Sequence, residues 1–256
     1  MSRLKNLFEV KNKRVLNVYC TAGYPQLNST LSVMEALQAN GADIIELGMP
    51  YSDPLADGEV IQGSSHVALS NGMTIEVLFK QLQAMREKIH IPVVLMGYMN
   101  PILQYGFEAF CKQAKEVGID GLILPDLPLY EFEQEYGSII KNNELDFVFL
   151  VTPETDSERL HQLDQLSTGF LYAVSSSATT GKEQDFSKVA IYLQSLQAAK
   201  LKNPILVGFG IKDKESFEAV AAYANGAIIG SAYIKALSKA QDINTSTQAF
   251  LEAILQ

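Results

Sequence analysis

Tryptophan is absent from this chain of 256 residues, and cysteine and histidine are scarce, with two and three residues respectively. Cys20 and Cys111 are too few for a disulfide scaffold, and no CxxC or histidine-rich spacing suggests a zinc site. The segment Met1–Glu9 is charged and amphipathic, without the apolar core of a signal peptide. These shortages predict a cytoplasmic protein without a structural metal.

Basic residues are also under-represented, with 20 Lys and Arg against 29 Asp and Glu. The net charge of -9 and the absence of a basic cluster argue against nucleic-acid binding, because phosphate backbones would repel the chain. The longest apolar runs, such as 91–96 and 227–230, have the length of strands and are far too short to span a bilayer. With 47% hydrophobic residues, the composition fits a globular protein with a large core and no membrane attachment.

Short apolar runs alternate with helical patterns along the whole chain. Their hydrophobicity is continuous rather than alternating, which is typical of strands covered on both faces in a parallel sheet. The predicted strands are 14–20, 43–47, 91–96, 121–124, 146–151, 169–174, 204–208 and 226–230. Helical spacing occurs between them, for example in 31–38, 107–115 and 216–223. Gly41, Gly118 and Gly226 each follow a helical pattern and are predicted to cap it in the left-handed conformation.

Eight strands with interleaved helices and no linker predict one α/β domain over residues 1–256, a closed (β/α)8 TIM barrel. The extra N-terminal helix would cap the barrel floor. A doubly wound open sheet is the main alternative on the pattern alone. In a barrel, the active site is expected where the loops leave the carboxyl ends of the strands.

Two carboxylates stand out at such a strand end. Glu46 lies among Ile44, Ile45 and Leu47, where a carboxylate is costly to bury, and Asp57 follows on a loop broken by proline and glycine. Such a pair can perform acid/base chemistry at neutral pH. The alternatives are a buried salt-bridge partner for Glu46 and a turn-forming residue for Asp57.

Glycines follow the last strands of the predicted barrel. Gly181, Gly208, Gly210 and Gly230 would let backbone N–H groups approach an anion, and Ser231 would add a hydroxyl at the start of a short helix. Because barrels commonly use these loops for phosphate, the pattern predicts a phosphate site. The other polar residues at strand ends are Tyr98, Asn100, Asp126 and Tyr172.

The stretch from Glu46 to Gly58, ELGMPYSDPLADG, resembles the signature of the tryptophan synthase alpha subunit family. Similar family motifs extend over essentially the whole chain, at 19–25, 61–62, 96–101, 124–128, 208–211 and 230–231. The resemblance implies a lyase that cleaves indole-3-glycerol phosphate to indole and glyceraldehyde 3-phosphate without a cofactor. It also implies an α2β2 complex with a beta subunit that holds pyridoxal phosphate.

The resemblance also implies roles for individual residues. Glu46 and Asp57 fall on the catalytic positions. The substrate-binding positions comprise the phosphate contacts Gly181, Gly210, Gly230 and Ser231, the indole-pocket residues Tyr19 and Tyr172, and also Tyr98 and Thr180. Tyr98, Asn100 and Asp126 could instead belong to a subunit interface or support the site from behind, and Asp126 could equally be a turn residue.

One segment departs from the family pattern. Ser175–Ser177 stand where an arginine is common, and Ala178 replaces a loop glycine, which puts the kinetics of loop closure in question. Thr180, expected to meet Asp57 when the loop closes, is retained.

Other barrel enzymes fit the sequence less well. Indole-glycerol-phosphate synthase would need a lysine at a strand end, and ribulose-phosphate epimerase would need metal-binding histidines there; the predicted strand ends offer neither. A stand-alone lyase that releases indole without a beta subunit remains an alternative, whereas retention of both carboxylates and Thr180 argues against an allosteric subunit without turnover.

Overall fold

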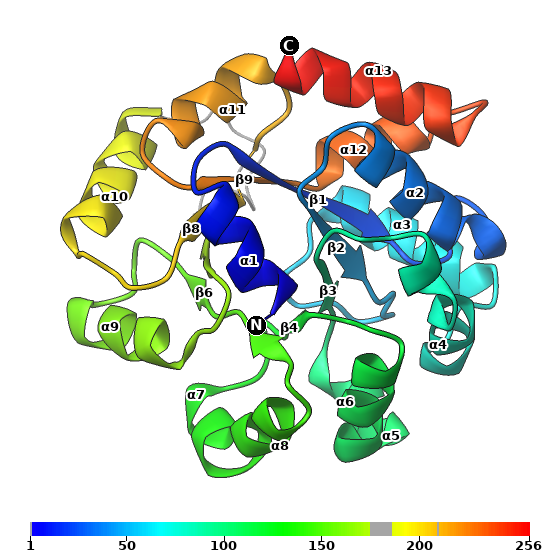
Figure 1. Ribbon diagram of the computed structural model, residues 1–256, viewed down its shortest axis with the longest axis horizontal. Helices are drawn as coiled ribbons and strands as arrows, with labels where there is room; N and C mark the ends of the chain where they lie inside the picture. Colours follow the sequence, from blue (N-terminus) through cyan, green and yellow to red (C-terminus); the bar gives the residue numbers. More distant parts are fainter. Residues whose placement is uncertain (1, 175–185, 209) are drawn as a thin grey trace.

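The structure is a computed structural model that describes residues 2–174, 186–208 and 210–256. The strands of this described part belong to one parallel sheet of nine strands in the order β5-β4-β3-β2-β1-β9-β8-β7-β6. The strands are β1 (Val15–Thr21), β2 (Ile44–Gly48), β3 (Val93–Met96), β4 (Gly121–Ile123), β5 (Asp146–Phe147), β6 (Leu150–Val151), β7 (Leu171–Val174), β8 (Ile205–Gly208) and β9 (Gly226–Ile229). The sheet is curled, and helices surround it in a (β/α)8 barrel (Figure 1).

The helices occupy the segments between the strands and both ends of the described chain. They are α1 (Arg3–Val10), η1 (Leu27–Ser29), α2 (Thr30–Ala39), α3 (Glu59–Ser70), α4 (Ile75–Leu82), η2 (Met85–Glu87), α5 (Met99–Tyr105), α6 (Phe107–Glu116), α7 (Leu129–Glu131), η3 (Phe132–Tyr136), α8 (Gly137–Asn142), α9 (Ser157–Leu166), α10 (Phe186–Ala198), α11 (Lys214–Ala221), α12 (Ser231–Leu237) and α13 (Ile243–Leu255). Several begin at a side-chain cap, as when the Ser2 hydroxyl accepts from the Lys5 N–H at the start of α1. Within the described residues, no helix is long and apolar enough to cross a bilayer.

The predicted fifth strand, 146–151, is divided into β5 and β6. Its first half pairs with β4 and its second half with β7. Between them the Val148 N–H donates to Leu122 O and Phe149 O accepts from the Tyr172 N–H, both at 3.0 Å. The segment therefore changes partner along its length and joins the two edges of the sheet.

The predicted glycine caps are confirmed at two positions and wrong at the third. Gly41 and Gly118 follow α2 and α6 with φ of 102° and 87°. Gly226 instead begins β9, where a Cβ atom would lie 1.9 Å from the Val15 carbonyl oxygen. Glycine is needed there because β9 approaches β1 closely.

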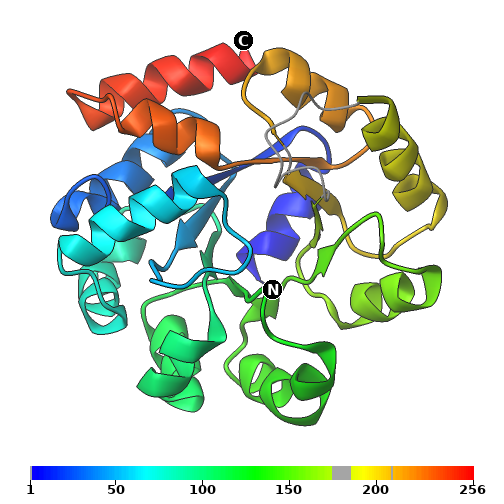
Figure 2. The ribbon, with the colours of Figure 1, turned by 180° about the vertical axis from the view of Figure 1, so that it is seen from behind.

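The barrel interior is apolar at its amino-terminal end. Leu4 of α1 joins a buried apolar cluster whose other members come from the strands around the barrel and the residues beside them, namely Val15, Ile44, Val94, Ile123, Val148, Phe170, Leu206 and Ile228. Figure 1 shows α1 lying over this end of the barrel, and Figure 2 shows α3 and the loop before it on the opposite side. The expected cap on the barrel floor is therefore present.

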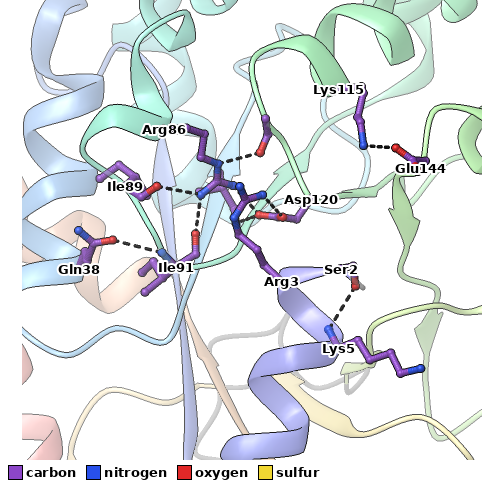
Figure 3. Close-up of polar contacts among 12 residues, drawn as sticks. Ser2, Arg3, Lys5, Gln38, Arg86, Ile89, Ile91, Lys115, Asp120 and Glu144 are labelled. Carbon is purple, nitrogen blue, oxygen red and sulfur yellow. Dashed lines mark hydrogen bonds and ion pairs between the residues drawn. The ribbon is translucent and has the colours of Figure 1, made fainter.

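An ionic cluster around the buried Asp120 fastens this floor. Asp120 accepts from Arg3 Nη1 at 2.9 Å, from Arg86 Nη2 at 2.5 Å and from the Val93 N–H at 2.7 Å. Arg86 also donates to the carbonyl groups of Gly118, Ile89 and Ile91 (Figure 3). Burial lowers the pKa of Arg86, and the adjacent Asp120 carboxylate opposes that effect. The cluster joins α1, η2 and the strands β3 and β4.

Candidate active site

The site begins where the apolar floor of the barrel ends. Side chains alternate along a strand, so Tyr19 shares the interior face of Val15, and Glu46 shares that of Ile44. The β1–β2 register sets Tyr19 beside Glu46. A cavity of about 640 Å³ lies at this end, and its lining includes Tyr19, Glu46, Asp57, Ile61, Met96, Leu150, Tyr172, Gly210, Lys212, Ile228, Gly230, Ser231, Lys235 and Phe250.

Glu46 is a carboxyl group almost removed from solvent, with a relative exposure of 1%. Its Oε2 accepts a hydrogen bond of 2.8 Å from Asn17 Nδ2. Burial raises the pKa of Glu46 to about 8, although the Asn17 hydrogen bond lowers it and the Asp57 charge raises it slightly further. A carboxyl group with such a pKa can both donate and accept a proton near neutral pH.

The raised pKa makes stability depend on pH. The folded chain binds the Glu46 proton up to pH of about 8, whereas the unfolded chain loses it near the ordinary value of 4.5. The destabilising contribution of Glu46 therefore grows as the pH rises from 4.5 to 8 and is constant above that. We expect Glu46→Gln to raise Tm relative to wild type at pH 9, with the difference vanishing at pH 4. Thermal unfolding across this pH range measures it, and a difference independent of pH would contradict it.

Asp57 lies on the loop between β2 and α3, partly buried at the cavity wall. Its Oδ2 accepts from the Tyr98 hydroxyl at 3.0 Å, and the same hydroxyl accepts from the Ala56 N–H at 3.1 Å. Burial raises the pKa of Asp57, and the Tyr98 hydrogen bond opposes that shift. Tyr98, itself buried, thus reaches the site through Asp57 and holds two consecutive residues of the loop.

Two tyrosines form aromatic walls beside Glu46. The Tyr19 ring lies over Gly48, where a Cβ atom would come within 2.0 Å of the tyrosine oxygen. The Tyr172 ring lies over Gly208 in the same way, with 2.3 Å to the nearest ring carbon. Gly208, predicted as part of the phosphate pattern, therefore makes room for an aromatic side chain. Sequence analysis missed Gly48, although a glycine at the end of a buried strand is a signal of close approach.

The remaining predicted residues are spread between this cavity and its surroundings. Gly210, with φ of 51°, lines it together with Gly230 and with Ser231, the first residue of α12. Lys212 and Lys235, which the sequence analysis did not single out, add positive charge to the lining. Thr180 and Gly181, and the rest of the segment 175–185, lie outside the described residues.

Two polar residues after strand ends have local partners. Both Asp126 carboxylate oxygens accept from the Met99 N–H at the start of α5, at 3.1 and 3.0 Å. Asn100 Nδ2 donates to the Tyr51 hydroxyl at 3.0 Å, and the Tyr51 ring lies 5.5 Å from that of Tyr98. The Asn100–Tyr51 contact connects α5 to the loop that holds Asp57, and the Asp126 contact connects it to the segment after β4.

Comparison with known proteins decides the family. The sequence model of the protein family described as tryptophan synthase alpha chain matches residues 5–256. The chain belongs to the tryptophan synthase alpha chain family. It is 47% identical to the tryptophan synthase alpha chain of Parabacteroides distasonis, with 100% of both chains covered, and 52% identical to that of Flavobacterium johnsoniae, with 90% of this chain and 91% of the relative covered.

Solved structures of the same family agree. The tryptophan synthase subunit alpha from Legionella pneumophila superposes with a TM-score of 0.90 at 34% identity, covering 99% of this chain and 97% of the other. A chain of tryptophan synthase from M. tuberculosis, in an aminoacrylate-bound form, gives 0.86 at 31% identity, covering 99% and 100%. This alpha chain is therefore a lyase of tryptophan biosynthesis that catalyses the alpha reaction, and its family membership implies a beta-subunit partner.

Proposed function

We propose that this alpha chain cleaves indole-3-glycerol phosphate to indole and glyceraldehyde 3-phosphate in the cavity described above, with Glu46 and Asp57 as its catalytic residues. The observation that carries the assignment is the buried Glu46 carboxyl group, whose pKa is raised to about 8 at the cavity. Asp57 on one wall and the glycine-rich edge with Ser231 supply the two further features that the substrate requires.

Glu46 performs the proton transfers in this proposal. Its protonated carboxyl group donates to indole C3, and the carboxylate then takes the proton from the glycerol hydroxyl as the carbon–carbon bond breaks. The electron pair of that bond returns to the indole ring, and Glu46 ends in its original protonation state. A group whose pKa is near the operating pH suits both steps.

Asp57 stabilises charge in this reaction. Protonation at C3 places positive charge on the ring nitrogen, and a carboxylate that accepts the indole N–H lowers the energy of that state. The Tyr98 hydroxyl, which donates to Asp57 Oδ2, supports the ionised form that this role needs.

The substrate is held at its two ends. We assign the indole ring to the space beside Tyr19 and Tyr172, and the phosphate to Gly210, Gly230 and Ser231, with Lys212 and Lys235 adding positive charge. Gly181 is a further proposed contact of the phosphate. Thr180 is proposed to meet Asp57 when the loop closes. Tyr98 serves the substrate through its hydrogen bond to Asp57.

The partner in this proposal is a tryptophan synthase beta subunit in an α2β2 complex, which holds the pyridoxal phosphate while the alpha reaction uses no cofactor. Large apolar side chains are exposed after two strands, with Leu55 at 85% and Leu103 at 48% relative exposure. Leu55 lies two residues before Asp57, so a partner covering it would reach the catalytic loop directly. We further propose that residues 1–256 form one domain and that it acts in the cytoplasm, where the buried cysteines Cys20 and Cys111 stay reduced.

The test is an assay of indole formation from indole-3-glycerol phosphate with and without added beta subunit. Strong stimulation by the beta subunit is the expected result. Full activity of the chain alone would instead indicate a stand-alone lyase, an alternative that is not favoured because relatives matching the whole chain are tryptophan synthase alpha chains. Absence of indole under both conditions would defeat the proposal.

Replacing Asp57 by asparagine tests the charge-stabilising role. We expect Asp57→Asn to lower kcat by about 10²-fold with a much smaller change in KM, because the lost charge acts mainly in the transition state. Asp53→Asn is the matched control, since Asp53 is exposed on the same loop. Steady-state kinetics of indole release measure both variants. Wild-type turnover in Asp57→Asn would show that Asp57 is a turn residue.

A further inference from the structure

Asn17 is a buried amide on β1 that the proposed reaction does not use. It lies two residues from Val15 and two from Tyr19 on the interior face of the barrel, and its relative exposure is 0%. Its Nδ2 donates to Glu46 Oε2 at 2.8 Å. Its Oδ1 is buried and has no hydrogen-bond partner among the described residues. The amide thus contacts Glu46 through one of its two polar atoms and leaves the other unpaired.

An amide at this position is unfavourable for stability. The inward-facing neighbours of Asn17 toward the barrel floor, such as Val15, Ile44 and Ile228, are apolar. A buried acceptor without a partner keeps the full free-energy cost of leaving water. A leucine has the same branched shape, with methyl groups larger than the amide atoms, and it would carry no unpaired acceptor. Packing therefore does not account for an asparagine at position 17. Its one side-chain hydrogen bond indicates a role at Glu46.

We propose that Asn17 is a positioning residue that fixes the Glu46 carboxyl group and directs its mobile proton to Oε1. This rests on the proposed function, in which Glu46 donates and recovers a proton. Oε2 accepts the Asn17 N–H, and a proton placed on Oε2 would point at this N–H, so that two donors would oppose each other. Oε1 accepts no hydrogen bond from the described residues, and Glu46 lines the cavity. The proton consequently leaves Oε1 for indole C3, and the hydroxyl proton returns to Oε1.

The amide also sets how readily Glu46 gives up its proton. Asp57 from the β2–α3 loop, Tyr19 and Cys20 from β1 and Tyr172 from β7 are the titratable groups that interact with Glu46. Burial and Asp57 raise the pKa of Glu46, whereas Asn17 lowers it. Without Asn17, the carboxyl group would be a weaker acid and would protonate C3 more slowly.

Asn17→Leu tests this inference in the full chain with beta subunit added. We expect kcat for indole formation to fall about tenfold with KM within about twofold, and Tm to be no lower than in wild type. The carbon-13 NMR signal of the Glu46 carboxyl group should titrate at higher pH. Asn17→Thr, which supplies a hydroxyl donor in place of the amide, should recover part of kcat and reverse part of the titration shift. Asn17→Ala serves for the same comparison if the leucine variant does not fold.

Val15→Ala is the matched control, because Val15 lies on the same strand and faces the same interior. It should lower Tm and leave both kcat and the Glu46 titration unchanged. The inference is overturned if Asn17→Leu keeps kcat within twofold of wild type, whether or not the titration moves. It is also overturned if Val15→Ala moves the titration as far as Asn17→Leu does. Failure of the proposed function is recognised separately, by indole release from a Glu46→Gln variant.

Discussion

Glu46→Gln is expected to reduce indole formation by about 10³-fold while binding of indole-3-glycerol phosphate persists. Glutamine keeps the volume of the side chain, and its amide can still contact Asn17, but it has no proton to give to C3 and no carboxylate to take one from the hydroxyl. General acid and base catalysis contributes about 10²–10⁴-fold in enzymes, and one residue is assigned both roles here. The loss should therefore appear in kcat.

Binding can be measured directly because the chain contains no tryptophan. Indole fluorescence then comes from the substrate alone, so its change on titration with the Glu46→Gln chain reports the dissociation constant. Val94→Ala is a suitable control: Val94 is paired with Glu46 in the β2–β3 register and is equally buried, yet it has no proton to transfer. Turnover of Glu46→Gln near that of wild type would remove Glu46 from the mechanism.

Asp120→Ala is expected to destabilise the fold by about 3–5 kcal/mol, the usual result of removing one partner of a buried ion pair. The substitution leaves the Arg86 guanidinium without its counter-charge and the buried Val93 N–H without its acceptor. For a chain of this size, the change corresponds to a fall in Tm of about 10 °C.

Urea unfolding followed by circular dichroism measures this loss. Glu35→Gln provides the comparison, because Glu35 and Lys88 form an exposed ion pair and such pairs contribute about 0–1 kcal/mol. Arg3, which is 45% exposed at its side chain, should also be the less important of the two arginines at Asp120. A loss below about 1 kcal/mol in Asp120→Ala would show that the cluster is structurally dispensable.

The sequence predicts the central strands well because β1, β2 and β9 are buried at every position, which makes their hydrophobicity continuous. It does not predict the division of 146–151, since that depends on which neighbour each half pairs with. The prediction for Gly226 fails for a related reason: the glycine permits close approach of β1, a contact between residues distant in the sequence.

In the candidate site, too, local sequence predicts some residues, whereas others depend on contacts between distant parts of the chain. Glu46 and Asp57 are visible in the sequence because a carboxylate among apolar residues, and another on a broken loop, are unusual locally. Asn17 is not, because its significance depends on the β1–β2 register that brings its amide to Glu46. Likewise, Asp120 meets Arg3 across 117 positions of the chain, a pairing that no local pattern reveals.

The position of α1 has a consequence for synthesis of the chain. Leu4 precedes the nine strands along the chain, yet the apolar cluster to which it belongs extends to Ile228. During translation α1 therefore has no complete docking surface until nearly all strands have left the ribosome. Closure of the barrel floor by the N-terminal segment is thus a late, long-range event, of the kind whose loop-closure entropy slows folding.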